Sequence, residues 1–492
     1  MESKVMDIIN EYCMNHGSYI PRDELMRIWL RSNAGTEDDF WREYKNLEEA
    51  GAICLEEANV YLPQNMKQEE YCAERLYELL ELLPLPMVLV PQRLYVGEIL
   101  LAEEQRDAVK MGLNSRLSLI LAGAGSGKTT LIQALVQSSG AKHYLICAPT
   151  GKAANNLTRR TDLHASTVHH ALGIWISRDF MRVEKDPALE LIVVDEAAML
   201  TLDMLAGLLR RAPDNCRIVL LGDTGQIPAV GAGRVVEDLT ALGFPCARLC
   251  MNHRQSSVDA GALYQNVSRY DQISGIVDFQ QDESFRFTPC VDRKEMMDAL
   301  AREAVSYIRT GGTAQIIVPS KNDAIELNQR VQRLANPNVK GGQVLTTEKF
   351  RYMDGDRVVI IRNNRSLGCY NGETGILRIG EQSFSVETES GRRYEWSGDN
   401  VRAGLEAILP AYAITAHRAQ GSEYDTVFVF VAPTKGRILN RNWLYTAISR
   451  ARKRLRLYGI PETVMFALHT IPPERCSKLV DRTLQLKYAD AG

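Results

Sequence analysis

The chain has 492 residues, of which 45% are apolar and 24% are charged, and its formal net charge is −3. This length exceeds a single compact core, so we expect roughly three or four domains. The charge balance excludes a uniformly basic surface but is compatible with a local basic groove. No apolar run approaches about eighteen residues, and the N-terminus lacks the pattern of a secretory signal. We therefore expect a cytoplasmic protein with no membrane segment.

Residues 1–66 predict a small helical domain that ends in two short strands. Its amphipathic segments are MDIINEYCMNHG, PRDELMRIWLR and EDDFWREYKNLEEAG, and its strands lie in AICLEEANVYLP. Three helices and a hairpin are the outline of a winged helix, and a plain helical packing domain is the alternative. Residues 67–99 predict a connecting helix, over 69–83, and a proline-rich linker.

Two further regions predict parallel sheets. In 100–252 the apolar strands LSLIL, HYLICA, LELIVV and CRIVLLG alternate with helical segments, which indicates a parallel sheet buried on both faces. A second α/β region covers 253–345 and 405–470, with strands in AQIIVP and DTVFVFV. Between its parts, 346–404 has the short strands and turns of a small β-barrel. Residues 471–492 form a C-terminal tail.

The cysteines do not predict a metal site. There are ten, without a C-x-x-C pair, and the closest two, Cys246 and Cys250, have no matching second pair. Because structural zinc sites use paired spacings, we expect reduced thiols instead.

The segment LILAGAGSGKTT predicts a phosphate-binding loop, because an apolar strand runs into glycines and a helix begins near Lys128. Lys128 would contact the β- and γ-phosphates of ATP, and the Thr129 hydroxyl would bind Mg²⁺. Ala122 stands where the strict pattern has glycine. The residues expected to bind the nucleotide here are Gly123, Ala124, Gly125, Ser126, Gly127, Lys128, Thr129 and Thr130.

Two later strands end in polar residues that suit triphosphate chemistry. LELIVVDEAAML delivers Asp195 and Glu196 to the carboxyl end of a strand. Asp195 suits the Mg²⁺ shell, and Glu196 suits polarising the attacking water. RIVLLGDTGQIPAVGAG contributes Gln226, whose amide can bond the γ-phosphate and report its loss.

The order of these and other segments resembles the RecD-like helicases of superfamily 1, from about residue 100 to 460. The resemblance rests on LAEEQRDAV, AGAGSGKTT, APTGKAANNL, STVHHALG, VVDEAAM, GDTGQIPAVGAG, NHRQ, AYAITAHRAQGSEYDTV and LYTAISRARKRL. It implies an α/β fold with two RecA-like parallel-sheet motor domains, an inserted small SH3-like β-barrel and an N-terminal winged-helix-like domain. It also implies the stand-alone form without upstream helix-hairpin-helix repeats.

The resemblance implies roles for four residues of the first motor domain. Gln105 would read the adenine edge, whereas a solvated glutamine at a helix start is the alternative. Thr150 and Lys152 would hold a DNA phosphate. His169 would touch the strand, although a lone histidine is as often a packed residue.

In the second domain the resemblance implies that Arg254 and Arg450 reach the γ-phosphate and make hydrolysis depend on closure. Arg450 is expected in a basic helix. His253 stands where many relatives have a base-stacking aromatic residue.

AYAITAHRAQGSEYD would supply further contacts to the DNA backbone and the nucleotide. Thr415, His417 and Arg418 are expected at the sugar–phosphate backbone, and Gln420 and Gly421 would link them to the nucleotide. The family form usually has Lys-Ser where this chain has Arg418-Ala419, which puts one hydroxyl contact in question.

Residues 170–188 contain IWISRDFMRVEKD, two short predicted strands with a turn at Ser177–Asp179. The resemblance makes this the pin that splits the duplex, and an ordinary surface hairpin is the alternative.

These features predict a DNA-dependent ATPase that uses ATP and Mg²⁺ and acts as a helicase on single-stranded DNA and duplex junctions, in repair or recombination. The resemblance implies 5′-to-3′ travel. The alternative is an ATP-switched DNA-binding or assembly factor without strand displacement. The acidic stretches of the N-terminal domain favour a protein partner over DNA there.

Overall fold

The computed structural model describes residues 3–32, 34–123, 125–174, 180–249, 261–310, 312–336, 344–364, 366–388, 391–434 and 438–490. The chain divides into two compact units. Unit 1 consists of Met1–Pro149, Leu157–Met251 and Pro473–Gly492, and unit 2 of Thr150–Asn156 and Asn252–Pro472. Each unit is described by itself. None of the described helices is long and apolar enough to cross a membrane.

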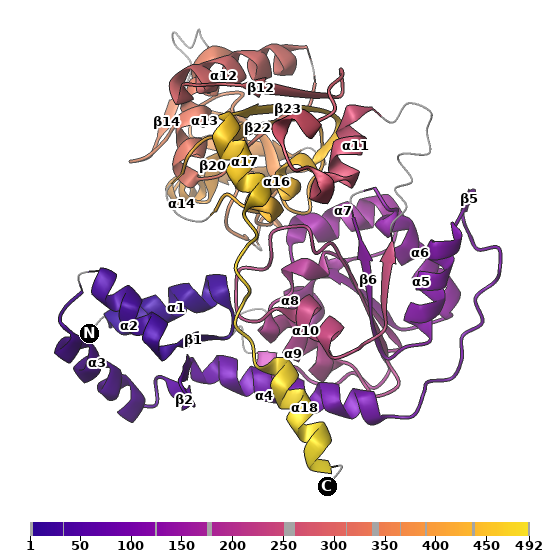
Figure 1. Ribbon diagram of the computed structural model, residues 1–492. Helices are drawn as coiled ribbons and strands as arrows, with labels where there is room; N and C mark the ends of the chain where they lie inside the picture. The colour runs from indigo at the N-terminus through magenta and orange to yellow at the C-terminus, as the bar shows by residue number, and fades with distance from the viewer. Residues whose placement is uncertain are drawn as a thin grey trace. The chain divides into compact units, whose positions relative to one another are not determined.

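Unit 1 begins with a small helical domain (Figure 1). Ser3 caps α1, and Thr36 and Asp39 form a reciprocal capping box on α3, which satisfies backbone N–H groups at both helix starts. Trp29 and Phe40 pack in its core. The strands form an antiparallel sheet in the order β1-β3-β2. The elements are α1 (Lys4–His16), β1 (Tyr19–Pro21), α2 (Arg22–Arg31), α3 (Glu37–Glu49), β2 (Cys54–Glu56) and β3 (Asn59–Tyr61). The winged-helix interpretation stays a prediction.

The sheet of unit 1 is parallel throughout, in the order β11-β6-β10-β9-β7-β8. Its strands are β6 (Leu117–Ala122), β7 (Tyr144–Ala148), β8 (Ser166–Thr167), β9 (Leu191–Val194), β10 (Arg217–Gly222) and β11 (Cys246–Leu249). This confirms the parallel α/β prediction for this region.

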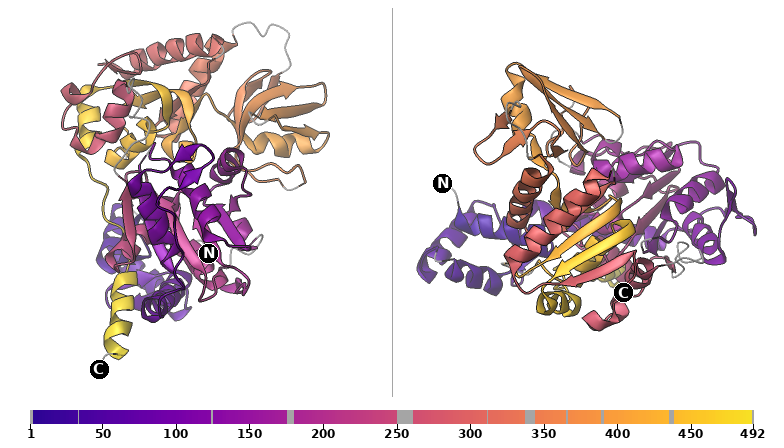
Figure 2. Two further views of the ribbon diagram at one scale, coloured as in Figure 1. Left: turned by 90° about the vertical axis from the view of Figure 1, so that its right-hand side faces the viewer. Right: turned by 90° about the horizontal axis from the view of Figure 1, so that it is seen from above.

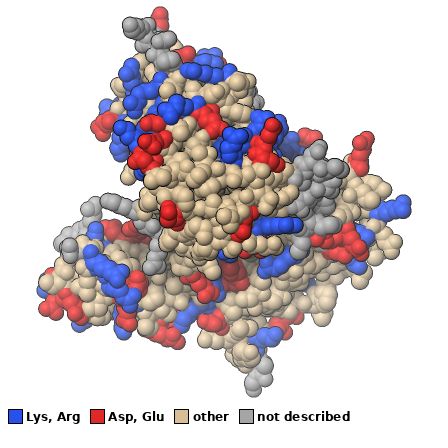
Figure 3. Space-filling model, turned by 45° about the horizontal axis from the view of Figure 1, so that its top comes forward, with Lys and Arg blue, Asp and Glu red and all other residues tan. Residues whose placement is uncertain are grey.

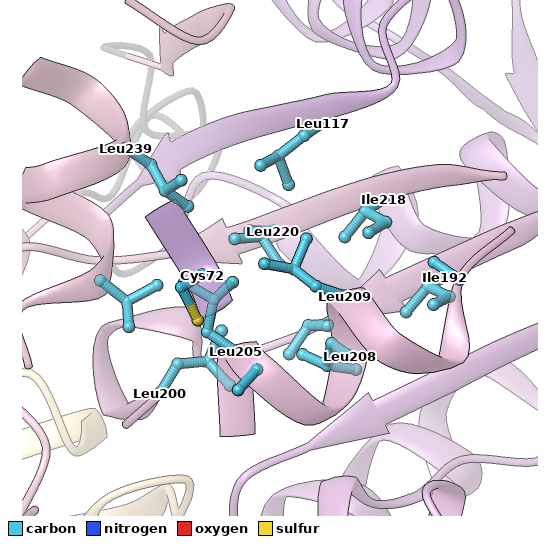
Figure 4. Packing of buried hydrophobic residues seen from close by; sticks show 14 of the residues in the cluster. Cys72, Leu117, Ile192, Leu200, Leu205, Leu208, Leu209, Ile218, Leu220 and Leu239 are labelled. Atoms are coloured by element: carbon cyan, nitrogen blue, oxygen red, sulfur yellow. The ribbon is translucent and has the colours of Figure 1, made fainter. Parts of the chain in front are cut away.

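Helices cover both faces of that sheet, which explains the uninterrupted apolar strands. Along β9, Ile192 packs in one hydrophobic cluster and Val193 in the other. Figure 4 shows Leu205, Leu208 and Leu209 of α9 against the first face, with Cys72 of α4 beside them. The remaining elements are α4 (Pro63–Glu81), β4 (Tyr95–Val96), β5 (Ile99–Leu100), α5 (Glu103–Leu113), α6 (Lys128–Ser139), α7 (Gly151–Thr161), α8 (Val168–Ala171), η1 (Phe180–Arg182), η2 (Ala197–Met199), α9 (Leu202–Arg211), α10 (Val235–Ala241) and α18 (Leu479–Asp490).

The predicted pin lies largely outside the described residues, because its turn falls at 175–179. The part that is described differs from the prediction: Phe180–Arg182 is a short 3-10 helix rather than a strand. Phe180 is fully buried among residues that include Leu172, and this burial holds the segment against the core of unit 1.

Unit 2 contains a second parallel sheet, in the order β12-β23-β22-β13-β21. Its strands are β12 (Phe285–Pro289), β13 (Ala314–Val318), β21 (Ala413–Thr415), β22 (Tyr424–Val431) and β23 (Ala451–Gly459). The helices are α11 (Ala262–Ser268), η4 (Tyr270–Gln272), η5 (Ile276–Asp278), α12 (Arg293–Arg309), α13 (Lys321–Ala335), α15 (Ala416–Ala419), α16 (Arg441–Ile448) and α17 (Pro461–His469).

The prediction of a basic helix around Arg450 is wrong. The helix α16 ends before Arg450, and the basic run that follows is strand β23. Leu455 and Leu457 are fully buried, whereas Arg454 before them is exposed and Arg456 between them is half-buried. This alternation has the period of a strand.

An antiparallel segment interrupts unit 2 between α13 and β21, and Figure 2 shows it in orange beside the parallel sheet. A hairpin, β14-β15, precedes a five-stranded sheet in the order β19-β18-β17-β16-β20. Its closure into a barrel stays a prediction. The elements are β14 (Val344–Thr346), β15 (Arg351–Met353), β16 (Arg357–Ile360), β17 (Thr374–Ile379), β18 (Ser383–Thr388), β19 (Arg393–Ser397), α14 (Asn400–Glu406) and β20 (Ile408–Pro410).

Candidate nucleotide and nucleic-acid site

The predicted phosphate loop joins β6 to α6. Gly125 and Gly127 have positive φ values of 86° and 83°, which only glycine adopts without strain. Ser126 Oγ donates to the Gly123 carbonyl at 2.8 Å, and α6 begins at Lys128. A helix start that directly follows a glycine-rich turn is an anion-binding arrangement, because the first N–H groups of a helix have no partner within the helix. Thr129 and Thr130 lie in the first turn of α6, and Ala124 lies outside the described residues.

Gln105 is buried beside this loop, with 4% of its surface exposed, so the solvated alternative is wrong. Its Nε2 donates to the Ser126 carbonyl at 2.8 Å, and its Oε1 accepts from the Ala102 N–H at 3.1 Å. Both ends of the amide are thus engaged, and the amide fixes α5 to the phosphate loop. The adenine-reading role stays a prediction.

Asp195 and Glu196 follow β9 at the edge where the phosphate loop follows β6. Glu196 has a left-handed backbone, with φ 53°, and its N–H donates to Asp195 Oδ1 at 2.8 Å. Burial and the adjacent Glu196 charge raise the pKa of Asp195 to about 6, while the Lys128 and Arg160 charges act in the opposite direction. Lys128 is therefore close enough to act on this carboxylate.

Gln226 comes to the same place from the loop after β10. Its Nε2 lies 3.4 Å from Glu196 Oε2 and 3.4 Å from Asp223 Oδ2, and the side chain is buried. The amide is thus held beside the carboxylate predicted to polarise water. Asp223 also accepts from the Gly225 N–H at 3.1 Å, which closes the turn that presents Gln226.

The oxygen donors here fit Mg²⁺ only together with phosphate oxygens. Among the described residues no cluster of three or more His, Cys, Asp or Glu side chains could hold a metal ion. Mg²⁺ in nucleotide enzymes is commonly held by one or two carboxylates plus the substrate's phosphates. Asp195 and the Thr129 hydroxyl suit that mode.

The first part of α7, up to Asn156, belongs to unit 2, where it meets the turn after α15. Asn156 Nδ2 donates to the Gly421 carbonyl at 2.7 Å, and Lys152 Nζ lies 3.2 Å from Tyr424 Oη. Gly421 has φ +69°, and a Cβ there would lie 3.0 Å from Ala153 Cβ. Thr150 Oγ1 accepts from the Ala153 N–H at 3.2 Å and so caps this turn.

The predicted DNA-contacting residues of α15 lie directly before that turn. Thr415 is the N-cap residue of α15, and His417 and Arg418 are exposed on the same short helix. Gln420, which follows them, is buried. The contacts of Asn156 with Gly421 and of Lys152 with Tyr424 therefore bring the two predicted site segments together.

Arg450 is buried beside the same turn. Its guanidinium donates to the Ser422 carbonyl at 3.3 Å, to the Thr446 carbonyl at 3.1 Å and to Ser449 Oγ at 3.0 Å. Within the described part of the chain it has no carboxylate in ion-pair range. Arg450 and Lys128 belong to different units, so the approach of the arginine to the γ-phosphate stays a prediction. Arg254 and His253 lie outside the described residues.

His169 packs against another side chain, as the alternative of a packed histidine predicted. Its ring meets that of Phe180 edge-on, with centroids 5.3 Å apart. A DNA contact for His169 stays a prediction.

Sequence reasoning missed Asn156 and Tyr424. Asn156 lies four residues after Lys152, on the same face of α7, and this spacing was the available signal. Tyr424 gave none, because its contact with Lys152 joins segments 272 residues apart.

Comparison with known proteins shows what the chain is similar to. Residues 100–288 match the model of an AAA domain, and residues 410–458 match the UvrD-like helicase C-terminal domain. The ATP-dependent RecD2 DNA helicase of Deinococcus radiodurans is 31% identical over 448 residues, covering 88% of this chain and 60% of that protein. The RecBCD enzyme subunit RecD of Mycolicibacterium smegmatis is 28% identical, covering 74% of this chain and 72% of that protein. The chain is thus similar to RecD helicases over most of its length.

This confirms the resemblance predicted from the motifs. The RecD-like chain spans about three fifths of the length of the Deinococcus relative. Among solved structures, the Pif1 helicase from Bacteroides in complex with ADP-AlF3 and ssDNA covers 80% of the chain and 99% of that structure, at 20% identity and a TM-score of 0.47.

Proposed function

We propose that this RecD-like chain is an ATP-dependent DNA helicase that translocates on single-stranded DNA, from 5′ to 3′, and opens duplex junctions. The observation that carries the proposal is the meeting of four groups at one sheet edge: the phosphate loop, Asp195, Glu196 and Gln226. Binding of ATP alone would not need a buried amide beside the water-polarising carboxylate.

Hydrolysis would use these side chains in distinct roles. Lys128 and the loop N–H groups hold the β- and γ-phosphates, and Glu196 orients the attacking water. Gln226 bonds the γ-phosphate and loses that bond on phosphate release. Mg²⁺, when bound through Asp195 and Thr129, neutralises phosphate charge.

The grip on DNA would follow from unit 2. Thr150, Lys152, Thr415, His417 and Arg418 contact the sugar–phosphate backbone, so binding is independent of sequence and falls steeply with salt. Arg450, together with Arg254, arrives at the γ-phosphate on closure and stabilises transition-state charge.

The surface charge is consistent with a local DNA-binding groove and not with a uniformly basic surface. On the face drawn in Figure 3, basic and acidic side chains are interspersed. We propose a protein partner for the acidic N-terminal domain.

Strand displacement on tailed duplexes tests the proposal. The wild type should release the strand from a 5′-tailed duplex with ATP and leave a 3′-tailed duplex intact. Lys128→Ala and Glu196→Gln should abolish release. ATP-dependent DNA binding without any release would contradict the helicase function and favour the switch alternative.

A further inference from the structure

The loop that carries Gln226 is held by a residue from the far end of the chain. Between Asp223 and Arg234 this loop exposes backbone groups that its neighbours must satisfy. The guanidinium of Arg475 donates one N–H group to the Ala229 carbonyl and another to the Gly231 carbonyl. All of these residues belong to unit 1.

The position of Arg475 is fixed by bonds that do not involve its side chain. The next residue, Cys476, donates its N–H to the His16 carbonyl at 2.7 Å and accepts from the Ser18 N–H at 2.8 Å. Ser477 Oγ then donates to Asp238 Oδ2 at 2.6 Å. We therefore expect this segment to keep its contacts with α1 and α10 when the side chain at position 475 is changed.

The bonding of Arg475 is not that of a stabilising ion pair. Within the described part of the chain, Arg475 has no carboxylate in ion-pair range, and its Nε has no hydrogen-bond partner. Burial lowers the pKa of this guanidinium, while the nearby Glu237 charge acts in the opposite direction; holding the charge away from water is costly. Its hydrogen bonds go instead to the backbone carbonyls of Ala229 and Gly231.

The same loop is held from the N-terminal domain. The Gly231 N–H donates to the Met14 carbonyl at 2.7 Å, and on the motor side the Ala229 N–H donates to the Ala198 carbonyl at 3.2 Å. Ala229 lies three residues after Gln226, and Ala198 two residues after Glu196. Displacing the loop at Ala229 thus changes the Gln226–Glu196 geometry directly.

We infer that Arg475 is a positioning residue for ATP hydrolysis, which sets the Gln226 amide against Glu196 by clamping the carbonyls of Ala229 and Gly231. This rests on the proposed hydrolysis at Glu196. A planar fork can hold both carbonyls at once, whereas a lysine ammonium reaches one of them reliably. Misplacement of about 1 Å at a group that orders the reactants can lower turnover by about 100-fold.

The test compares full-length wild type, Arg475→Ala, Arg475→Lys and the control Arg482→Ala. Arg482 lies in the same C-terminal segment but pairs with Glu56 and Glu69, away from the loop. With saturating single-stranded DNA, we expect kcat to fall about tenfold in Arg475→Ala and less in Arg475→Lys, with KM for ATP within about twofold. Arg482→Ala should keep kcat within about twofold even where its Tm falls.

Hydrogen exchange gives a readout independent of activity. Amides of residues 223–234 should exchange faster in Arg475→Ala than in wild type, and at the wild-type rate in Arg482→Ala. Unchanged kcat and exchange in Arg475→Ala would overturn the inference, as would an equal loss of kcat in Arg482→Ala. If the wild type showed no DNA-stimulated hydrolysis, the proposed function would be refuted instead. The exchange measurement would still test whether Arg475 holds the loop of residues 223–234.

Discussion

Glu69 of α4 offers a quantitative test of how the C-terminal helix is held. Its carboxylate is fully buried and accepts three hydrogen bonds. Oε1 accepts from the Lys478 N–H at 3.1 Å and lies 3.2 Å from Ser477 Oγ, and Oε2 accepts from Tyr61 Oη at 3.2 Å and Arg482 Nε at 3.3 Å. One side chain thus joins the N-terminal domain, α4 and α18.

Glu69→Gln keeps the bond from the Lys478 N–H to Oε1 but sets an NH₂ group against the Arg482 N–H. Removing one charge from a buried pair costs about 3–5 kcal/mol. Arg482 retains Glu56 at 2.8 Å, so we expect the lower end, about 3 kcal/mol, in the free energy of local opening of α18. That equals roughly a 100-fold acceleration of amide exchange in α18 under conditions where exchange reports the opening equilibrium.

The neighbouring Glu70 provides the control. Its side chain is 44% exposed and lies 3.9 Å from Arg482, so Glu70→Gln should change the same free energy by less than about 1 kcal/mol. If Glu69→Gln accelerates exchange no more than Glu70→Gln, the buried network does not hold α18 and the reasoning is refuted.

Two other substitutions probe further features. Burial raises the pKa of Asp238 to about 6; because the folded value lies above the unfolded one, the stability this group contributes is full below about pH 4 and is lost as pH rises through 6. Asp238→Asn should therefore flatten the decline of Tm between pH 4 and 6, and an unchanged slope would contradict the assignment. Gly421→Ala forces a side chain into a left-handed backbone against Ala153, a strain of about 1–2 kcal/mol; we expect weaker DNA stimulation of the ATPase with ATP affinity retained, whereas Gly243→Ala, also left-handed but with open space around its Cβ, should keep full stimulation.

The features that sequence predicts here are those with local causes. A buried parallel strand followed by glycines and a helix start is written within a dozen residues, so the phosphate loop and its helix begin where expected, at Lys128. Asp195 and Glu196 follow from the rule that ligands meet the carboxyl ends of strands. The similarity to RecD helicases followed from the order of such segments.

The features that sequence did not predict depend on contacts between distant segments. The basic run around Arg454 was predicted to be helical. It is a strand because pairing within the parallel sheet buries Leu455 and Leu457 on alternate positions. Gln105 is buried because its side-chain amide donates a hydrogen bond to the Ser126 carbonyl of the phosphate loop. Nothing in the tail marked Arg475, because the carbonyls it clamps lie more than 240 residues away.

We propose that hydrolysis depends on an arginine from unit 2, and the Arg450→Lys variant tests this most directly. The substitution keeps the charge but removes the planar fork. DNA-stimulated ATP turnover should fall by about 1,000-fold, the scale of an arginine finger, while binding of a fluorescent ATP analogue stays near that of the wild type. Turnover of Arg450→Lys at the wild-type rate would contradict the claim.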